Sequence, residues 1–177
     1  MKTRNILSKV AVVACLLCLV LTAAAQTKRR RTTRKTSRAT TTATANAAEI
    51  KESAEKVSTQ LKNVTKFIYV LGGVAQTIQS IDNDAKAGRA SRATIETNTK
   101  NKQTVVATIE NLRAGLAALE AEFQTKPALA PYLAQIQGIS DITANAENQA
   151  SAGQLIDSGK TLLEVVEKLS DTLAAMP

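Results

Sequence analysis

The sequence has 177 residues and a formal net charge of +8, with 44% hydrophobic residues but only two Phe, two Tyr and no Trp. This length suits one domain with a modest core. Because the chain has no His, a Ser-His-Asp triad, a Cys-His dyad and a His-ligated metal centre are excluded. Neither GxGxxG nor GxxxxGK followed by Ser or Thr is present, and only carboxylate-pair or Ser-Lys chemistry stays open. We therefore expect a non-enzymatic protein without cofactor or metal.

Residues 1–25 are predicted to be a secretory signal peptide. Three Lys or Arg and no acid precede an apolar run of twelve residues at 10–21, and an A-x-A site ends at Ala25, an order typical of such leaders. The run is shorter than the ~20 residues that cross a bilayer, which disfavours a permanent anchor. Lipoprotein cleavage before Cys15 would leave too short an apolar run. We expect cleavage after Ala25 and a bacterial periplasmic or secreted protein, because the remaining chain has no Cys for the disulfides usual in small secreted animal domains.

The charge of the remaining chain is segregated. Residues 26–44 contain seven Lys or Arg and no acid, whereas residues 45–177 contain 13 basic and 15 acidic residues. The seven cations are Lys28, Arg29, Arg30, Arg31, Arg34, Lys35 and Arg38. Self-repulsion and the lack of large apolar side chains predict a disordered tail at 26–44. We expect it to bind an anionic envelope polymer or lipid headgroups; a solvated linker is the alternative, and nucleic acid is disfavoured because the leader exports the chain.

Residues 45–177 are expected to form an all-α domain. Proline occurs only at 127, 131 and 177, which permits long helices. A 3-4 repeat of apolar residues predicts a first helix that stops near Gly88. The repeat positions are Ile50, Ala54, Val57, Leu61, Val64, Ile68, Leu71, Ala75 and Ile78. The width of this stripe favours a bundle over a two-stranded coiled coil.

The rest of the domain is read as two further long helices and a short cross-helix. Ser91 is the expected N-cap of the second helix, the cross-helix covers about 128–137, and the last helix covers 142–175. This reading gives an antiparallel bundle of three long helices. A break near Gly153 or Gly159 would give a four-helix bundle instead.

One segment departs from the amphipathic pattern. Residues 67–75 contain no polar interruption, and two of them, Tyr69 and Val70, point away from the apolar stripe. Gly72 and Gly73 add two poor helix formers, each costing about 1 kcal/mol relative to Ala. We interpret Phe67, Tyr69, Val70, Gly72 and Gly73 as a contact for a protein partner or a second copy, or as a hinge. The alternative is burial, under the cross-helix around Tyr132 or by a backbone that approaches the glycines.

These features favour an exported, non-enzymatic envelope protein, a helical bundle whose cationic tail binds an anionic envelope surface. A periplasmic holdase chaperone or assembly factor is the first alternative, since it needs an apolar cradle such as residues 67–75. A membrane-active bundle that inserts its first helix is the second alternative. It is disfavoured because the apolar run is too short to span a bilayer.

Overall fold

The computed structural model describes the backbone of residues 31–177 and the side chains of residues 43–177. The chain divides into two units, Met1–Thr42 and Ala43–Pro177, and the described side chains belong to the second. The predicted signal peptide lies outside the described residues. Helix α1 (Arg31–Lys86) begins inside the segment 26–44. The described backbone is helical from residue 31, where the sequence predicted disorder, and residues 26–30 lie outside the described residues.

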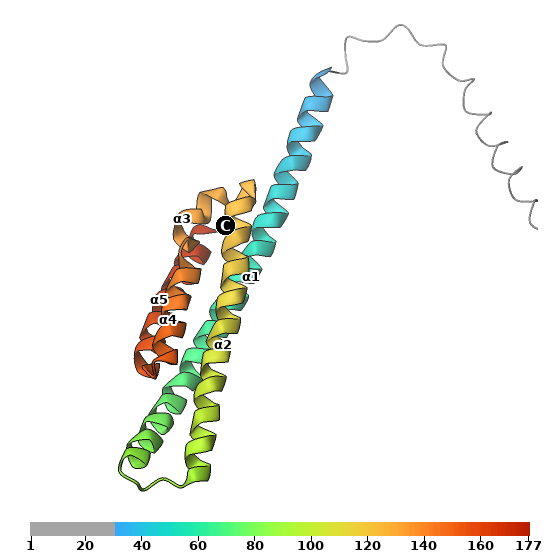
Figure 1. Ribbon diagram of the computed structural model, residues 1–177. Helices are drawn as coiled ribbons and strands as arrows, with labels where there is room; N and C mark the ends of the chain where they lie inside the picture. Colours follow the sequence, from blue (N-terminus) through green and yellow to red (C-terminus); the bar gives the residue numbers. More distant parts are fainter. Residues whose placement is uncertain (1–30) are drawn as a thin grey trace, which may run out of the picture. The chain divides into compact units, whose positions relative to one another are not determined.

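The described residues form helices and turns, without a strand, which confirms the all-α prediction. After α1 come α2 (Arg92–Thr125), the 3-10 helix η1 (Pro127–Tyr132), α3 (Leu133–Ile136), α4 (Ile139–Ser151) and α5 (Leu155–Ala175). Within Ala43–Pro177, α1 and α2 run antiparallel, and α4 and α5 form a shorter hairpin beside them (Figure 1). The pair η1 and α3 replaces the predicted cross-helix at 128–137.

The preference for three long helices is wrong, and the four-helix alternative is right. The predicted last helix breaks at Gly153, which has φ +80°, a backbone conformation that glycine adopts without steric cost. The Gly153 N–H donates to the carbonyl of Ala150, and the Gln154 N–H donates to that of Gln149. This is the Schellman pattern that ends a helix. The chain therefore reverses here, and α5 packs back along α4.

The turn between α1 and α2 follows the sequence prediction. Gly88 has φ +70°, its N–H donates to Ala85, and the Arg89 N–H donates to Asp84, which again is a Schellman end. Helix α2 starts at the predicted N-cap, because the Ser91 Oγ accepts from the Thr94 N–H at 3.1 Å. Both ends of the turn are therefore fixed by local hydrogen bonds.

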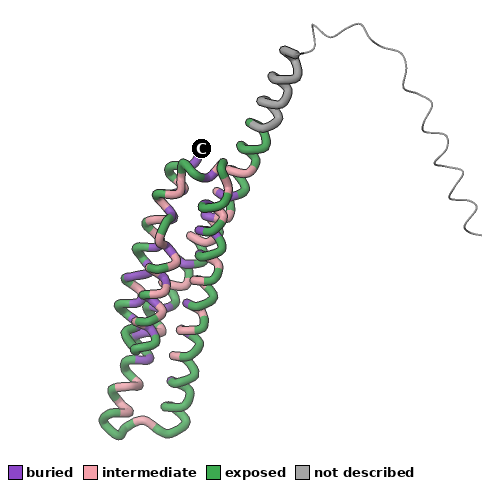
Figure 2. The backbone as a smooth tube through the Cα atoms, turned by 45° about the horizontal axis from the view of Figure 1, so that its top comes forward, coloured by how far each residue is buried: buried purple, intermediate pink, exposed green. Residues whose placement is uncertain are grey.

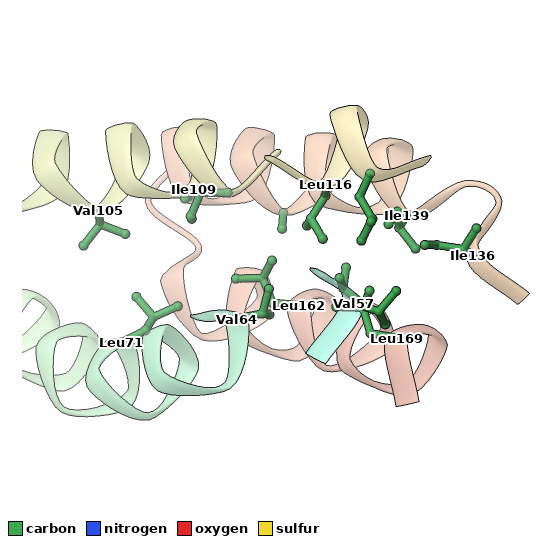
Figure 3. Close-up of a cluster of buried hydrophobic side chains, with 14 of the residues drawn as sticks. Val57, Val64, Leu71, Val105, Ile109, Leu116, Ile136, Ile139, Leu162 and Leu169 are labelled. Carbon is green, nitrogen blue, oxygen red and sulfur yellow. The ribbon is translucent and has the colours of Figure 1, made fainter. Parts of the chain in front are cut away.

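The core lies along the line where the helices meet. On α1 the residues that face it recur every seven positions, at Val57, Val64, Leu71 and Ile78, and none is more than 3% exposed. Figure 3 shows α1 side chains facing those of α2, with Leu162 among them. Buried positions concentrate where four helices run together, while the turn between α1 and α2 is largely exposed (Figure 2). Packing between helices, rather than helix propensity, therefore accounts for most of the stability.

A polar layer closes the core at the α1–α2 end. Asn98 is 3% exposed and donates to the Asp82 carboxylate at 2.8 Å. Lys102 pairs with the same carboxylate at 2.7 Å. The antiparallel register explains why two polar residues can occupy stripe positions of α2, because both face Asp82 of α1.

Candidate functional site

An apolar groove of about 730 Å³ lies between α1 and α2. Helix α1 supplies Lys66, Phe67, Val70, Gly73, Val74, Thr77 and Ile78, and helix α2 supplies Asn101, Thr104, Val105 and Thr108. Its only charged lining residue is Lys66, and no carboxylate lines it. The volume lies within the range of small-molecule pockets.

Helical periodicity explains where the groove lies. Because a helix has 3.6 residues per turn, positions spaced four, three and four apart share one face. Lys66, Val70, Gly73 and Thr77 have this spacing and are exposed, whereas Leu71 beside them is only 2% exposed. These four residues therefore form the exposed part of the α1 wall, while Ile78, which also lines the groove, belongs to the core.

Four of the five predicted contact residues, all except Phe67, are exposed at the surface of the described unit. The exposed fraction is 86% for Tyr69 and 58% for Val70. Phe67 is half-buried and packs against the core. Beyond the adjacent residues and the nearby backbone of α1, no atom lies within 4 Å of a Cβ added at Gly72 or Gly73. The alternative that the cross-helix or a neighbouring backbone covers this segment is therefore wrong within the described chain.

Sequence reasoning missed the α2 wall of the groove. Asn101, Thr104 and Thr108 line it beside Val105, and their spacing is that of one helix face. Thr104 and Thr108 bond to the carbonyls four residues earlier, at 2.9 and 2.7 Å. Both hydroxyls therefore already donate a hydrogen bond within α2. The repeated threonines at this spacing were a usable signal.

The cationic residues predicted to bind an anionic surface lie outside the described side chains, from Lys28 to Arg38. In the described domain, most basic side chains pair with acids of the same unit. Examples are Lys56 with Glu122 at 2.8 Å and Arg113 with Glu147 at 3.2 Å. Lys62 and Lys66 have no such ion pair among the described residues. Lys66 lines the groove, and Lys62 lies one helical turn before it on α1.

Glu120 has a shifted pKa that packing explains. Burial alone would raise the pKa of this carboxyl, but three hydrogen bonds outweigh it and lower the pKa below its usual value. The Ser140 hydroxyl donates at 2.6 Å, the Gly138 N–H at 2.6 Å and the Ser140 N–H at 3.2 Å. Glu120 therefore caps the start of α4 from α2, which is a structural role.

A second shifted pair joins α1 to the end of α2. The hydrogen bond from Lys56 lowers the pKa of the Glu122 carboxyl, with a further contribution from Lys126, and burial opposes them. The same contact raises the pKa of the Lys56 ammonium. Both groups are partly exposed, so the pair stabilises the hairpin modestly.

Comparison with known proteins yields no match to a family model, a curated protein or a solved structure. Among the described helices none is long and apolar enough to cross a membrane. Residues 43–177 also contain no cluster of three or more His, Cys, Asp or Glu side chains placed to hold a metal ion.

Proposed function

We propose that this protein is an exported, non-enzymatic component of the bacterial envelope, whose helical domain is held at an anionic surface by the cationic tail at 26–44. The observation that supports the proposal is charge segregation: seven Lys or Arg and no acid stand in this tail, while residues 45–177 have a small acidic excess. Basic residues near an anionic membrane contribute about 1 kcal/mol each. The tail alone therefore suffices for measurable binding.

The ion pairs of the described domain support the proposal that the tail, and not the domain, binds the anionic surface. Lys56, Lys102 and Lys126 are engaged with acids of neighbouring helices or of their own helix. Such cations are less available to an external polyanion than the residues of the tail. Surface binding is therefore assigned to the tail, and packing to the domain.

Vesicle co-sedimentation tests the proposal. The protein is mixed at low salt with phosphatidylglycerol-containing vesicles and with neutral phosphatidylcholine vesicles. We expect binding to the anionic vesicles only, lost above about 0.5 M salt because screening shortens the range of the attraction. A variant with the seven tail cations changed to Gln should not bind. A matched control with the same tail residues in shuffled order should bind like the wild type, because binding depends on the charge of the tail and not on the order of its residues.

A holdase or assembly factor is a second candidate, and the groove between α1 and α2 favours it. A chaperone of this kind needs an accessible apolar surface, and Val70 with half-buried Phe67 and Val74 provides one. Suppression of the aggregation of an unfolded client, lost in Val70→Lys, would support this candidate. Equal suppression by the wild type and by Val70→Lys would contradict it.

A further inference from the structure

The face that α1 turns away from the core combines two features that are each costly for a solitary helix. Tyr69 and Val70 expose apolar surface, at 86% and 58%. Gly72 and Gly73 follow within one turn, and each costs about 1 kcal/mol relative to Ala in a helix. Beyond the adjacent residues and the nearby backbone of α1, a Cβ added at either glycine would meet no atom of the described domain within 4 Å. Packing within the described domain therefore explains neither the exposure of Tyr69 and Val70 nor the presence of Gly73 in the groove.

We infer that the groove between α1 and α2 binds a second copy of this chain, with the two α1 helices antiparallel across a two-fold axis. The intervals between Lys66, Val70, Gly73 and Thr77 are four, three and four residues, so their order is the same from either end of the helix. An antiparallel copy in this register therefore places Val70 of each chain opposite Gly73 of the other. The bulky side chain of one helix fills the space that the glycine of the other leaves. A two-fold interface requires such self-complementarity.

The same register accounts for Tyr69. It lies at one edge of the α1–α1 contact, and the two-fold axis brings Tyr69 of the second copy to the same edge, so the two exposed rings flank the contact. Aromatic side chains contribute much of the apolar area of stable interfaces. The two rings therefore add apolar area along that edge of the dimer.

Charge along α1 favours an antiparallel second copy over a parallel one. Between Glu55 and Asp82 this helix contains lysines and no carboxylate. Asp84 lies at the other end of the groove face and is 45% exposed, although Arg89 already contacts it. In the antiparallel register Lys62 lies within one helical turn of Asp84 from the second copy. A parallel arrangement would instead bring Lys62 and Lys66 against their own equivalents.

The available area sets the expected strength. From residue 62 to residue 84, α1 is about 33 Å long at 1.5 Å per residue, and its width is about 11 Å. Two such strips bury on the order of 700 Å² in total, and the α2 walls of the two grooves raise this toward roughly 1,000 Å². Interfaces of that size belong to weak, reversible complexes. We therefore expect a monomer–dimer equilibrium with a dissociation constant in the micromolar range.

Sedimentation equilibrium of the purified protein from about 5 to 500 µM tests this inference. The wild type should shift from monomer to dimer across the range. Gly73→Gln should weaken the dimer at least tenfold, because the new side chain occupies the space for Val70. Gly72→Gln is the matched control: it changes the neighbouring glycine, which does not line the groove, and it should dimerise like the wild type. Both variants should fold, since Gln is a better helix former than Gly and neither site is crowded.

Engineered cysteines test the orientation, because residues 26–177 contain no Cys of their own. In the antiparallel register Lys66 faces Thr77 of the second copy. A mixture of Lys66→Cys and Thr77→Cys proteins of different tag size should therefore form the mixed disulfide under mild oxidation. A Glu167→Cys control on α5 should not cross-link.

A protein that stays monomeric at about 500 µM would overturn the inference, as would disulfides formed only between identical variants. A monomer whose groove instead suppresses client aggregation would also overturn it, and would support the holdase candidate. Loss of dimerisation can be distinguished from loss of binding to anionic vesicles. Gly73→Gln should keep its binding to anionic vesicles, and the Gln-substituted tail should leave dimerisation unchanged.

Discussion

Removing the Glu120 carboxylate should release the start of α4 from α2. Glu120 is 6% exposed and accepts from the Gly138 N–H, the Ser140 N–H and the Ser140 hydroxyl. The cap residue of α4 is Gly138, which has no side chain to cap the helix itself. The free N–H groups at this helix start therefore depend on a side chain from another helix.

The size of the effect follows from these contacts. A hydrogen bond to a charged group contributes about 1.5–3 kcal/mol, and a buried donor left without a partner costs about 1–3 kcal/mol. Because the three bonds share one carboxylate, their contributions do not add fully. We expect Glu120→Ala to lower the free energy of unfolding by about 3 kcal/mol. That is a large fraction of the ~5–15 kcal/mol typical of a domain.

Urea unfolding followed by circular dichroism measures this loss at pH 7. Glu120→Gln keeps the size of the side chain but removes its charge. The free energy of unfolding of this variant should lie between those of the wild type and Glu120→Ala. The pKa of Glu120 is lowered in the folded state. Its contribution is therefore complete above the unfolded pKa of about 4.3 and is lost as the pH falls through the folded value. The stability difference between the wild type and Glu120→Gln should accordingly shrink below about pH 4.

Two results would refute this reasoning. The first is a loss below about 0.5 kcal/mol for Glu120→Ala at pH 7, which would mean that α4 does not depend on the carboxylate. The second is a difference between the wild type and Glu120→Gln that stays constant down to about pH 3, which would mean that ionisation of Glu120 does not matter.

The remaining predictions concern turns and packing. Gly153→Ala should destabilise the domain by about 1 kcal/mol because Gly153 has φ +80°. Gly72→Ala, within a helix, should stabilise the domain by a similar amount. The thermal midpoints of the two variants should therefore shift in opposite directions, and equal shifts would contradict the placement of the helix break at Gly153. Ile109→Ala should cost about 2–5 kcal/mol in urea unfolding because Ile109 is fully buried. The control Ile95→Ala, at a side chain that is 41% exposed, should cost under about 1 kcal/mol, and equal losses would place the core elsewhere.

The helices could be predicted from the sequence where local rules and packing agree. The apolar stripe of α1, the Ser91 cap and the stop at Gly88 are local signals, and each corresponds to an observed hydrogen bond or buried face. The number of helices was harder to predict. Gly153 and Gly159 were equal candidates for a break, and only the first has a positive φ. Gly159 lies inside α5, and Leu71 of α1 is 3.6 Å from a Cβ added there.

The groove was only half predictable for a related reason. Residues 67–75 break the amphipathic pattern of their own helix, so the α1 wall was visible in the sequence. The α2 wall consists of threonines and Asn101 around Val105, which look like an ordinary solvated face until the register of α1 against α2 is known. Pairings between distant segments, such as Glu120 with Ser140, were invisible for the same reason.

The proposed function depends most on the cationic tail. The direct measurement is the retention of the protein on isolated bacterial envelope material at low salt, compared with a variant that lacks residues 27–44. We predict that the complete protein is retained and is released by added salt, while the shortened variant stays in solution with its helical domain folded. Equal retention of the two proteins would contradict the account.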